Sequence, residues 1–494
     1  MNIIKDLICE IEENIPVNKW EFLGIKIWPL VRLTISTDLG GEINTQRVQA
    51  SGFLDQIKEL CKKISYSFKV VFSKFLDYKM NRIEKNSSVL LLGRSSSRNT
   101  LWKGKWLDPN LDSMRYYLKK MGKKSIHLEF DFLGLTRIPR YSPSLFIHNI
   151  IQFSKIKAYM QNLLHKTQKL NIPKYPEFIQ ILKSHNINLS IMDKNKIRYY
   201  VYLLRIRANY FKWFIKKHHS ELGMCTGYYI PEHLAFILAC FESSIPSVDI
   251  QHGLQGEFLS AYSEWKHEYR QLLPTSFWVW TEFEKDYIQN WAHETSPFPY
   301  LGGNLWLDFC SNAENGEIRK FLKEIRHIKT NEYNSHILLS LQPNNTLDYF
   351  FNIIKQSPKT WFWWIRLHPR MLEQIDELIQ LLEQNNILNY SVTEASQFPL
   401  PLILKNVDVH ITYNSTVVID ADQFNLKSIV LDENGSDYFP QQFQKGVAYY
   451  ERSTPDIVNR LDFLLKSTQD VKITSTKDTA PVSRLEKFFA LLNL

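Results

Sequence analysis

A short apolar run, Trp361–Ile365, limits the folds open to this chain of 494 residues more than any other stretch. The run is aromatic and branched, contains no turn residue and lies between Pro358 and Pro369, so it predicts a strand buried on both faces, as in a parallel sheet. Because Pro369 cannot continue a strand and keeps His368 extended, Arg366 and His368 fall at the carboxyl end of that strand. This is the edge at which open α/β sheets bind ligands.

A second strand is predicted at 407–412, followed by small polar residues and a helical apolar run at 417–419. Ser415 and Thr416 then sit at a helix N-terminus, where free backbone N–H groups and the helix dipole favour an anion. With Arg366 and His368 on a neighbouring strand, the pattern predicts a site for a phosphate or diphosphate. The alternative is that Ser415 only caps a helix and His368 only ends a strand.

These motifs carry a resemblance to a known class of enzymes. The order R-x-H-P at 366–369, Y-N-S-T at 413–416 and an acidic residue, Asp420, in the next helix resembles the carboxyl-terminal half of bacterial GT-B transferases. Similar patterns occur in CDP-glycerol glycerophosphotransferases, capsule-type Kdo transferases and bacterial sialyltransferases, all of which use cytidine-nucleotide donors. The resemblance covers most of the chain past Ser88. It implies an α/β protein with two Rossmann-like domains that face each other across a cleft.

The donor-binding residues follow from the strand-end positions and from this resemblance. The predicted set is Arg366, His368, Pro369, Asn414, Ser415, Thr416, Gln342 after the strand at 336–341, and Glu394 in the loop before Pro399. The resemblance implies that His368 contacts or protonates the leaving phosphate. Glu394 is expected to contact a ribose, with a solvent-facing carboxylate as the equal alternative.

The composition is that of a folded globular protein with a basic surface. Lys+Arg exceed Asp+Glu by 60 − 51 = 9, which suits anionic partners, although charge that serves only solubility explains it equally well. The five cysteines are scattered without a CxxC pair, so neither a disulfide framework nor a zinc site is predicted and a reducing cytoplasm fits. No signal peptide and no transmembrane run is expected.

The predicted order of domains is a helical segment at 1–85, an acceptor domain at 86–305 and a donor domain at 306–494 with a terminal helix. A helical insertion is expected at about 142–220 in the acceptor domain, and the terminal helix is expected to pack back onto that domain. The stretch Trp20–Arg32 is assigned no chemistry. The basic amphipathic pattern from Phe53 to Met80 predicts a helix that either lies on an anionic membrane surface or packs one face in a core.

The acceptor domain has its own polar strand ends. A strand at 88–93 leads into Arg94 and Ser95, which bind phosphate or form a plain surface loop, since no GxGxxG is present. A strand–helix–strand unit at 224–250 places Glu232 at a helix start and His252 after a strand, on one edge of the sheet.

The sequence D-x-Q-H-G at 249–253 resembles the amino-half motif of capsule-type transferases. It implies that Gln251 and Gly253 line the acceptor side of the cleft together with Arg94 and Ser95. We expect Gly253 to allow a sharp turn beside a ligand. Glycerophosphotransferases carry a tryptophan where this chain has Gln251, which weakens the case for CDP-glycerol.

The predicted reaction needs neutralisation of a leaving phosphate and a base for the acceptor hydroxyl. His252 and Glu232 are the two candidates for the base, and His368 is the candidate on the leaving group. No DxD pair follows a strand, so we expect no metal and no cofactor beyond the nucleotide-activated sugar.

The sequence therefore predicts a cytoplasmic, peripheral-membrane glycosyltransferase of capsule or O-antigen synthesis, with a CMP-linked donor of the Kdo or sialic acid type. The acceptor would be a glycan or lipid-linked glycan at the anionic inner membrane. Alternatives are a CDP-glycerol or CDP-ribitol phosphotransferase, a UDP- or GDP-sugar transferase, or a non-catalytic membrane- or nucleic-acid-binding scaffold. Polar residues at several strand ends argue against a scaffold, and no nucleic acid partner is expected.

Overall fold

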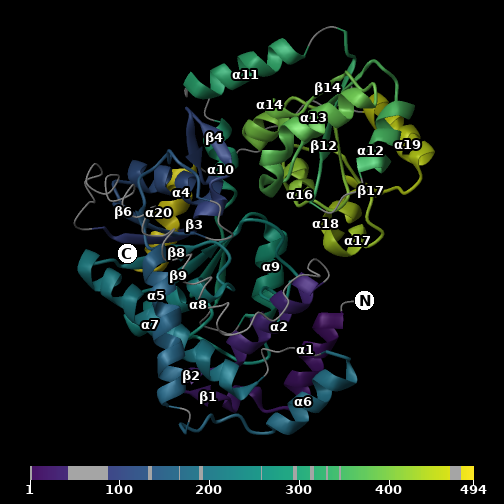
Figure 1. The fold of residues 1–494 in the computed structure, drawn as a ribbon. Coiled ribbons are helices and arrows are strands. Elements are labelled where there is room, and N and C mark those ends of the chain that lie inside the picture. The colour runs from purple at the N-terminus through teal and green to yellow at the C-terminus, as the bar shows by residue number, and fades with distance from the viewer. Residues whose placement is uncertain are drawn as a thin grey trace. The chain divides into compact units, whose positions relative to one another are not determined.

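The computed structural model describes residues 3–42, 87–131, 136–165, 167–187, 193–257, 259–292, 297–311, 316–329, 332–343, 347–467 and 480–494. The chain divides into two α/β units, shown in Figure 1. The first unit comprises Met1–Ser97, Asn110–Gly303 and Val482–Leu494, and the second comprises Arg98–Pro109 and Asn304–Pro481. The chain passes from the first unit to the second near residue 304, and two other segments, residues 98–109 and the last helix, belong to a different unit from the residues that precede them.

The N-terminal segment begins the first unit. It consists of α1 (Ile3–Asn14), the 3₁₀ turn η1 (Val17–Lys19), β1 (Glu21–Phe22), β2 (Ile25–Lys26) and α2 (Trp28–Glu42). The predicted helical segment is present as α1 and α2, and it also contains β1 and β2, which form an antiparallel hairpin. Leu23 and Gly24 both have positive φ, 55° and 73°, which is the geometry of a two-residue hairpin turn. The predicted basic helix from Phe53 to Met80 lies outside the described residues.

A seven-stranded parallel sheet forms the centre of the first unit, in the order β11-β10-β9-β8-β3-β6-β7. The strands are β3 (Val89–Arg94), β6 (Ser125–Phe130), β7 (Leu145–Phe146), β8 (Leu222–Cys225), β9 (Ser247–Ile250), β10 (Ser276–Val279) and β11 (Phe298–Leu301). Strands that follow β3 add on one side of it, whereas β8 and its successors add on the other. The order of the chain therefore reverses between β3 and β8, the position at which such sheets bind ligands.

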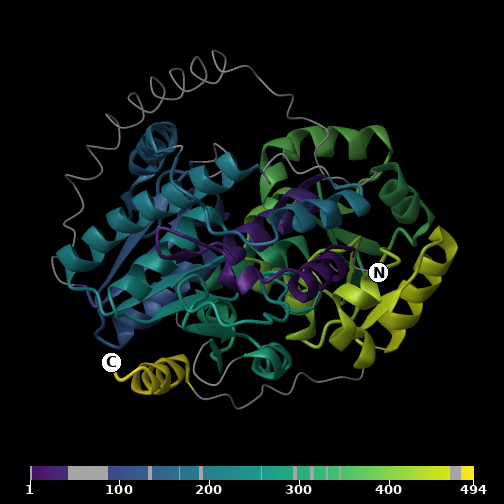
Figure 2. The same cartoon turned by 90° about the horizontal axis from the view of Figure 1, so that it is seen from below.

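The first unit contains further helices. They are α4 (Pro109–Lys120), α5 (His148–Leu164), α6 (Tyr175–Ser184), α7 (Lys194–His218), α8 (Pro231–Glu242), α9 (Glu282–Trp291) and α20 (Pro481–Leu491), with the 3₁₀ turn η2 (Ser95–Ser97) after β3. α7 packs against α5 and α8 and buries Val201, Leu204 and Phe211, so it is a core helix of the first unit. Figures 1 and 2 show α20 among the elements of the first unit, where Phe488 contacts Trp278.

The second unit has a six-stranded parallel sheet in the order β14-β13-β12-β15-β16-β17. The strands are β12 (Ser335–Ser340), β13 (Trp361–Arg366), β14 (Tyr390–Ser391), β15 (Val409–Thr412), β16 (Ser428–Val430) and β17 (Ala448–Tyr450). The sequence analysis expected the strands before His368 and before Ser415 to be neighbours. This expectation is wrong, because β12 lies between β13 and β15 and pairs with both of them. The polar ends of β13 and β15 are therefore about 10 Å apart, two strand spacings, and the chain order reverses between β12 and β15.

The other elements of the second unit are short. They are the hairpin β4 (Thr100–Trp102) and β5 (Lys105–Leu107), and the helices α10 (Leu305–Ser311), α11 (Gly316–Ile328), α12 (Leu347–Gln356), η4 (Pro369–Gln374), α13 (Ile375–Gln384), α14 (Thr393–Gln397), α15 (Leu400–Leu404), α16 (Val417–Asp422), α17 (Gly435–Tyr438), α18 (Pro440–Gln444) and α19 (Thr454–Ser467). The hairpin joins this unit because Trp102 packs on Trp306 and Phe309 of α10.

Both units contain a parallel sheet with helices packed against it, preceded by N-terminal helices, so the predicted α/β class with two Rossmann-like domains is confirmed. Among the described residues, no helix combines the length and the apolar character that a membrane span requires.

Candidate functional site

The carboxyl end of β13 presents Arg366. Its Nη1 donates hydrogen bonds to the carbonyls of Ala395 at 2.6 Å and Phe398 at 2.9 Å, which fixes the half-buried guanidinium. Burial lowers the pKa of Arg366 to about 10, and Asp420 acts in the opposite direction. Burial likewise raises the pKa of Asp420 to about 7, partly offset by Arg366. Arg366 therefore stays charged at neutral pH and is held in one orientation at the strand end.

His368 lies two residues further on and caps η4. Its Nδ1 accepts a hydrogen bond from the Arg370 backbone N–H at 3.2 Å, and Pro369 occupies the first position of the 3₁₀ turn. Burial and the positive charge of Arg370 lower the pKa of His368 to about 4. The imidazole is therefore neutral near pH 7 and, because Nδ1 accepts, carries its proton on Nε2. Such an N–H group suits a phosphate oxygen.

A chain of hydroxyl contacts joins β12 to β15 at the position where the strand order reverses. The Thr412 hydroxyl donates to the Ser340 carbonyl at 2.8 Å and accepts from the Ser415 backbone N–H at 3.2 Å. Ser415, which is buried, in turn accepts from the Val417 N–H at 3.4 Å. Ser415 and Thr416 do precede a helix, as the sequence predicted, but α16 has only six residues and its dipole contributes little.

The other predicted donor residues lie around this chain of contacts. Asn414 is exposed and donates to Asp432 Oδ2 at 2.9 Å, while Thr416 is exposed and makes no side-chain cap. Gln342 is half-buried and lies two residues after Ser340, the end of β12.

Glu394 is not in a loop, as the sequence suggested. It lies in the first turn of α14 and accepts a hydrogen bond from the Ser391 hydroxyl at 2.6 Å. Its carboxylate therefore already serves to hold the start of a helix.

In the first unit, Arg94 ends β3 at the reversal of strand order, and His252 follows β9. The His252 ring lies nearly parallel to that of Tyr229, with centroids 6.3 Å apart, and Nε2 lies 3.4 Å from the Tyr229 hydroxyl. Burial and the charge of Arg94 lower the pKa of His252 to about 3. Ser95, which follows Arg94 in the chain, is buried, and its hydroxyl donates to Asp131 Oδ1 at 3.3 Å.

Sequence reasoning missed Gly227, which makes room for His252. Gly227 has φ of 71°, and a Cβ placed on it would lie 3.1 Å from Cε1 of His252. The positive φ and the close approach together require glycine at this position. We expected the sharp turn at Gly253, but this residue, which the structure describes, does not have a positive φ.

Asp249 was also missed as a site residue. It is fully buried in β9 and accepts hydrogen bonds from the Tyr262 hydroxyl at 2.8 Å and the Tyr228 N–H at 3.1 Å. Burial raises its pKa to about 7, and these hydrogen bonds and Arg94 act against that shift. An aspartate in the middle of a predicted buried strand was the available signal, because carboxylates are rarely buried unless they are paired.

Gln251 is fully buried, and both ends of its amide are bound by backbone. Nε2 donates to the Gly253 carbonyl at 3.0 Å, and Oε1 accepts from the Trp280 N–H at 2.7 Å. The side chain therefore fixes the turn after β9 to the end of β10, which keeps His252 at the sheet edge.

Glu232 opens α8 and forms an ion pair with Arg207 of α7, with Oε1 and Nη1 3.0 Å apart. Arg207 is buried and also donates to the Ser154 hydroxyl at 3.0 Å. The next residue, His233, is fully buried and donates from Nδ1 to the Gly227 carbonyl at 3.0 Å. β8, α8 and β9 form the predicted strand–helix–strand unit, so Glu232 and His252 do lie on one edge of this sheet.

Each unit thus gathers polar side chains at the carboxyl edge of its sheet. Arg366, His368 and Ser415 offer N–H, hydroxyl and positive groups to an anion, whereas His252 and Glu232 offer proton acceptors. Within the described ranges, no group of three or more His, Cys, Asp or Glu side chains is placed to hold a metal ion.

No family model and no curated protein sequence matches this chain. Among solved structures, it is similar to a UDP-GlcNAc 2-epimerase from Neisseria meningitidis bound to UDP-GlcNAc, at 14% identity and a TM-score of 0.47, over 82% of this chain and 100% of that one. A UDP-GlcNAc 2-epimerase from Methanocaldococcus jannaschii is similar at 12% identity and a TM-score of 0.47, over 82% and 99% of the two chains. A glycosyltransferase of Streptomyces sp. SF2575 is similar at 10% identity and a TM-score of 0.37, over 82% and 95%.

Proposed function

We propose that this protein is a metal-independent GT-B glycosyltransferase that uses a nucleotide-activated sugar, bound through its phosphate at the strand-end site of the second unit. The observation that carries the proposal is the pair on β13: a guanidinium fixed by two carbonyls and, two residues on, a neutral histidine that presents Nε2–H. A fixed cation beside a neutral N–H donor stabilises negative charge as it develops on a leaving phosphate.

In the proposed reaction the acceptor hydroxyl oxygen attacks the anomeric carbon of the donor sugar. The bond between that carbon and the phosphate oxygen breaks, and its electron pair stays on the released nucleotide. His368 and Arg366 stabilise the released phosphate, and the acceptor proton passes to a base in the first unit. No metal is assigned a role in this scheme.

Two side chains compete for the role of base. The lowered pKa of His252 keeps it neutral at physiological pH, the correct state for a base, although a weak one. Glu232 is paired with the buried Arg207, and accepting the proton would neutralise the carboxylate and leave the Arg207 charge without its partner. We assign the role to His252 and keep Glu232 as the alternative. In this proposal Gln251 positions His252 instead of touching the acceptor.

We further propose a CMP-linked donor of the Kdo or sialic acid type and a capsule or O-antigen acceptor, because the R-x-H-P and Y-N-S-T motifs resemble those of cytidine-donor enzymes. A CDP-glycerol or CDP-ribitol phosphotransferase and a UDP- or GDP-sugar transferase are the alternatives within the fold. A ligand that binds only the folded state raises the melting temperature. CMP and CDP should therefore raise Tm more than UMP, UDP or GDP.

A larger shift with UDP or GDP would replace the cytidine assignment and leave the transferase proposal standing. No shift with any nucleotide at millimolar concentration would instead favour the non-catalytic scaffold.

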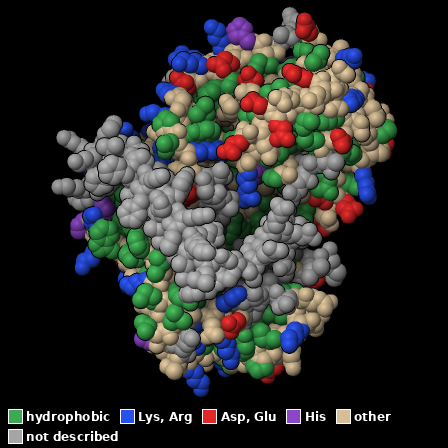
Figure 3. Space-filling view, in the orientation of Figure 1, with side chains coloured by type: hydrophobic (Ala, Val, Ile, Leu, Met, Phe, Trp, Pro, Cys, Tyr) green, Lys and Arg blue, Asp and Glu red, His purple; other side chains and the backbone are tan. Residues whose placement is uncertain are grey.

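Peripheral contact with an anionic membrane is also proposed, and α5 and α7 support it. Neither helix contains an Asp or Glu. The most exposed apolar side chains of α5 are Phe153 (57% exposed), Met160 (56%) and Leu164 (74%), and α7 exposes Trp213 with the Lys217 ammonium 4.4 Å from its ring centroid. Figure 3 shows hydrophobic and basic side chains beside one another on the left of the view, over the region of α5 and α7 in Figure 1. Apolar side chains among lysines suit a surface of anionic lipid.

The chain should bind vesicles that contain anionic lipid, less tightly at high salt, and substitution of Phe153, Met160 and Leu164 by serine should weaken that binding. Phe463→Ser is the matched control, since Phe463 on α19 is 59% exposed. Equal binding by the triple variant would reject this surface.

A further inference from the structure

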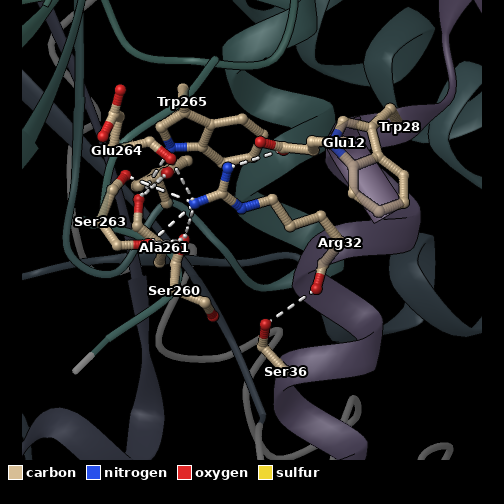
Figure 4. Close-up of polar contacts among 10 residues, drawn as sticks. Glu12, Trp28, Arg32, Ser36, Ser260, Ala261, Ser263, Glu264 and Trp265 are labelled. Atoms are coloured by element: carbon tan, nitrogen blue, oxygen red, sulfur yellow. Dashed lines mark hydrogen bonds and ion pairs between the residues drawn. The ribbon is translucent and has the colours of Figure 1, made fainter. Parts of the chain in front are cut away.

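The N-terminal segment, to which the sequence assigned no chemistry, contains a buried ion pair. Glu12 of α1 and Arg32 of α2 lie 2.9 Å apart between Oε1 and Nη1, with side-chain exposures of 6% and 1%. The Trp28 indole N–H donates to the same carboxylate oxygen at 2.6 Å, as Figure 4 shows. Removing two charges from water costs more than their attraction returns unless further hydrogen bonds are made. Nη2 of the Arg32 guanidinium makes them.

Nη2 of Arg32 reaches the segment that follows β9, here called the β9 loop and defined as residues 259–265. It donates to the Ser260 carbonyl at 3.1 Å, the Glu264 carbonyl at 2.8 Å and the Ser263 hydroxyl at 2.8 Å. The guanidinium carbon of Arg32 lies 4.0 Å from the centroid of the Trp265 ring. Figure 4 shows these groups gathered around one nitrogen. One side chain of the N-terminal segment thus fixes both ends of residues 260–264.

The β9 loop in turn contacts the surroundings of His252. The Tyr262 hydroxyl donates to Asp249, and the Tyr228 hydroxyl donates to the Ala261 carbonyl. The Tyr262 ring also meets Tyr229 edge-on, with centroids 6.0 Å apart, and Tyr229 is the residue that lies against His252. Arg32 is therefore linked to His252 through the β9 loop, which contains Tyr262, and through Tyr229.

We propose that Arg32 is a positioning residue for His252: by fixing the β9 loop, it holds Tyr262 and Tyr229 in the places that orient the histidine ring. The inference rests on the proposed function, since it assigns Arg32 to the acceptor side of that reaction. A planar guanidinium can bind several carbonyls and a carboxylate at once, which a lysine ammonium does less well. An arginine that served only to join α1 to α2 would not need the contacts with the loop.

The test must separate this role from simple stabilisation. Arg32→Met alone would leave the Glu12 carboxylate buried without its cation, so the informative variant is the double substitution Glu12→Gln and Arg32→Met. It removes both charges, keeps an acceptor for Trp28 and fills the space, an exchange that buried ion pairs often tolerate. We expect Tm to change little and CMP affinity to stay within about twofold. The kcat of sugar transfer should fall by about 10- to 100-fold, because small displacements of a catalytic group cost that much.

Arg205→Met is the matched control. Arg205 also ties the N-terminal segment to the body of the unit, through the Leu23 carbonyl at 3.0 Å, but no contact with the β9 loop is found for it among the described residues. It should leave kcat within about twofold. An equal fall in kcat in both variants would mean that Arg32 only stabilises the segment, and the inference would be overturned.

Tyr262→Phe supplies a second readout. If Arg32 acts through the loop, combining Tyr262→Phe with the double substitution should lower kcat little further, because coupled residues do not add. Fold-losses that multiply would overturn the inference.

Amide hydrogen exchange tests the placement of the loop without any activity assay. Residues 259–265 should exchange faster in the double variant than in wild type, and unchanged exchange there would overturn the inference. A wild-type protein that transfers no sugar would instead refute the proposed function, while faster exchange in the variant would still support the role of Arg32 in fixing the loop.

Discussion

The two strand-edge sites differ in how far along the chain their supports lie. In the second unit, Arg366 is fixed by carbonyls 29 and 32 residues away, and His368 by a backbone N–H two residues away. In the first unit, the loop beside His252 is fixed by Arg32, which lies 231 residues from Ser263. Arg366 and His368 are thus held by groups of the same unit that lie within about 30 residues along the chain. The loop beside His252 depends on the N-terminal segment, which is far away along the chain.

This difference predicts how the removal of a side chain should affect each site. Removing a side chain from the second unit should remove one contact with the donor and little else. Removing one from the first unit should also disturb the residues that it supports. The following substitutions test that contrast.

The largest effect is expected for His252→Ala. Loss of a general base lowers rate by ~10²–10⁴-fold, so kcat should fall in that range while CMP affinity, measured by calorimetry, changes by less than about twofold. Glu232→Gln is the companion variant. Retained activity in His252→Ala together with loss in Glu232→Gln would assign the base to the carboxylate.

His368→Ala should act on the donor instead. A hydrogen bond to a charged group contributes about 1.5–3 kcal/mol, so CMP affinity should fall by about 10- to 100-fold. His327→Ala, an exposed histidine on α11 of the same unit, is the control and should bind normally. CMP binding that survives loss of both Arg366 and His368 would mean that the phosphate site lies elsewhere.

Asp249→Asn tests the buried carboxylate behind His252. Its pKa is about 7 in the folded chain against about 3.9 in an unfolded one, so between these values the folded state binds more protons. The stability that Asp249 contributes is therefore complete below about pH 4 and is lost as pH rises to about 7. Over that range the equilibrium constant for folding falls by at most about tenfold for each pH unit.

The asparagine variant lacks that titration, so its Tm relative to wild type should improve between pH 5 and pH 7. Asp286→Asn, which changes an exposed carboxylate on α9, should show no such trend. A Tm difference between Asp249→Asn and wild type that is constant across this range would contradict the assignment.

The smallest effect is expected for Ser415→Ala. A neutral hydrogen bond contributes about 0.5–1.5 kcal/mol, so CMP affinity should fall by only a few-fold, less than in His368→Ala. A loss as large as that of His368→Ala would show that Ser415 also holds the backbone of the turn through Val417, and would weaken the contrast between the two sites.

The sequence by itself determined the two α/β units, the strand at Trp361–Arg366 and the strand-end positions of Arg366, His368, Ser415 and His252. These depend on apolar runs of strand length and on prolines, which act over a few residues.

Only the tertiary structure decided which strands are adjacent, and so that β12 separates β13 from β15. It also decided that Gly227 and not Gly253 has the positive φ, that both ends of the Gln251 amide bind backbone, and that Arg32 holds the β9 loop. Each of these depends on contacts between segments distant in sequence, which no local pattern encodes. The burial that shifts the pKa values of His252, Asp249 and Asp420 arises in the same way, because the surroundings of a side chain exist only once the chain has packed.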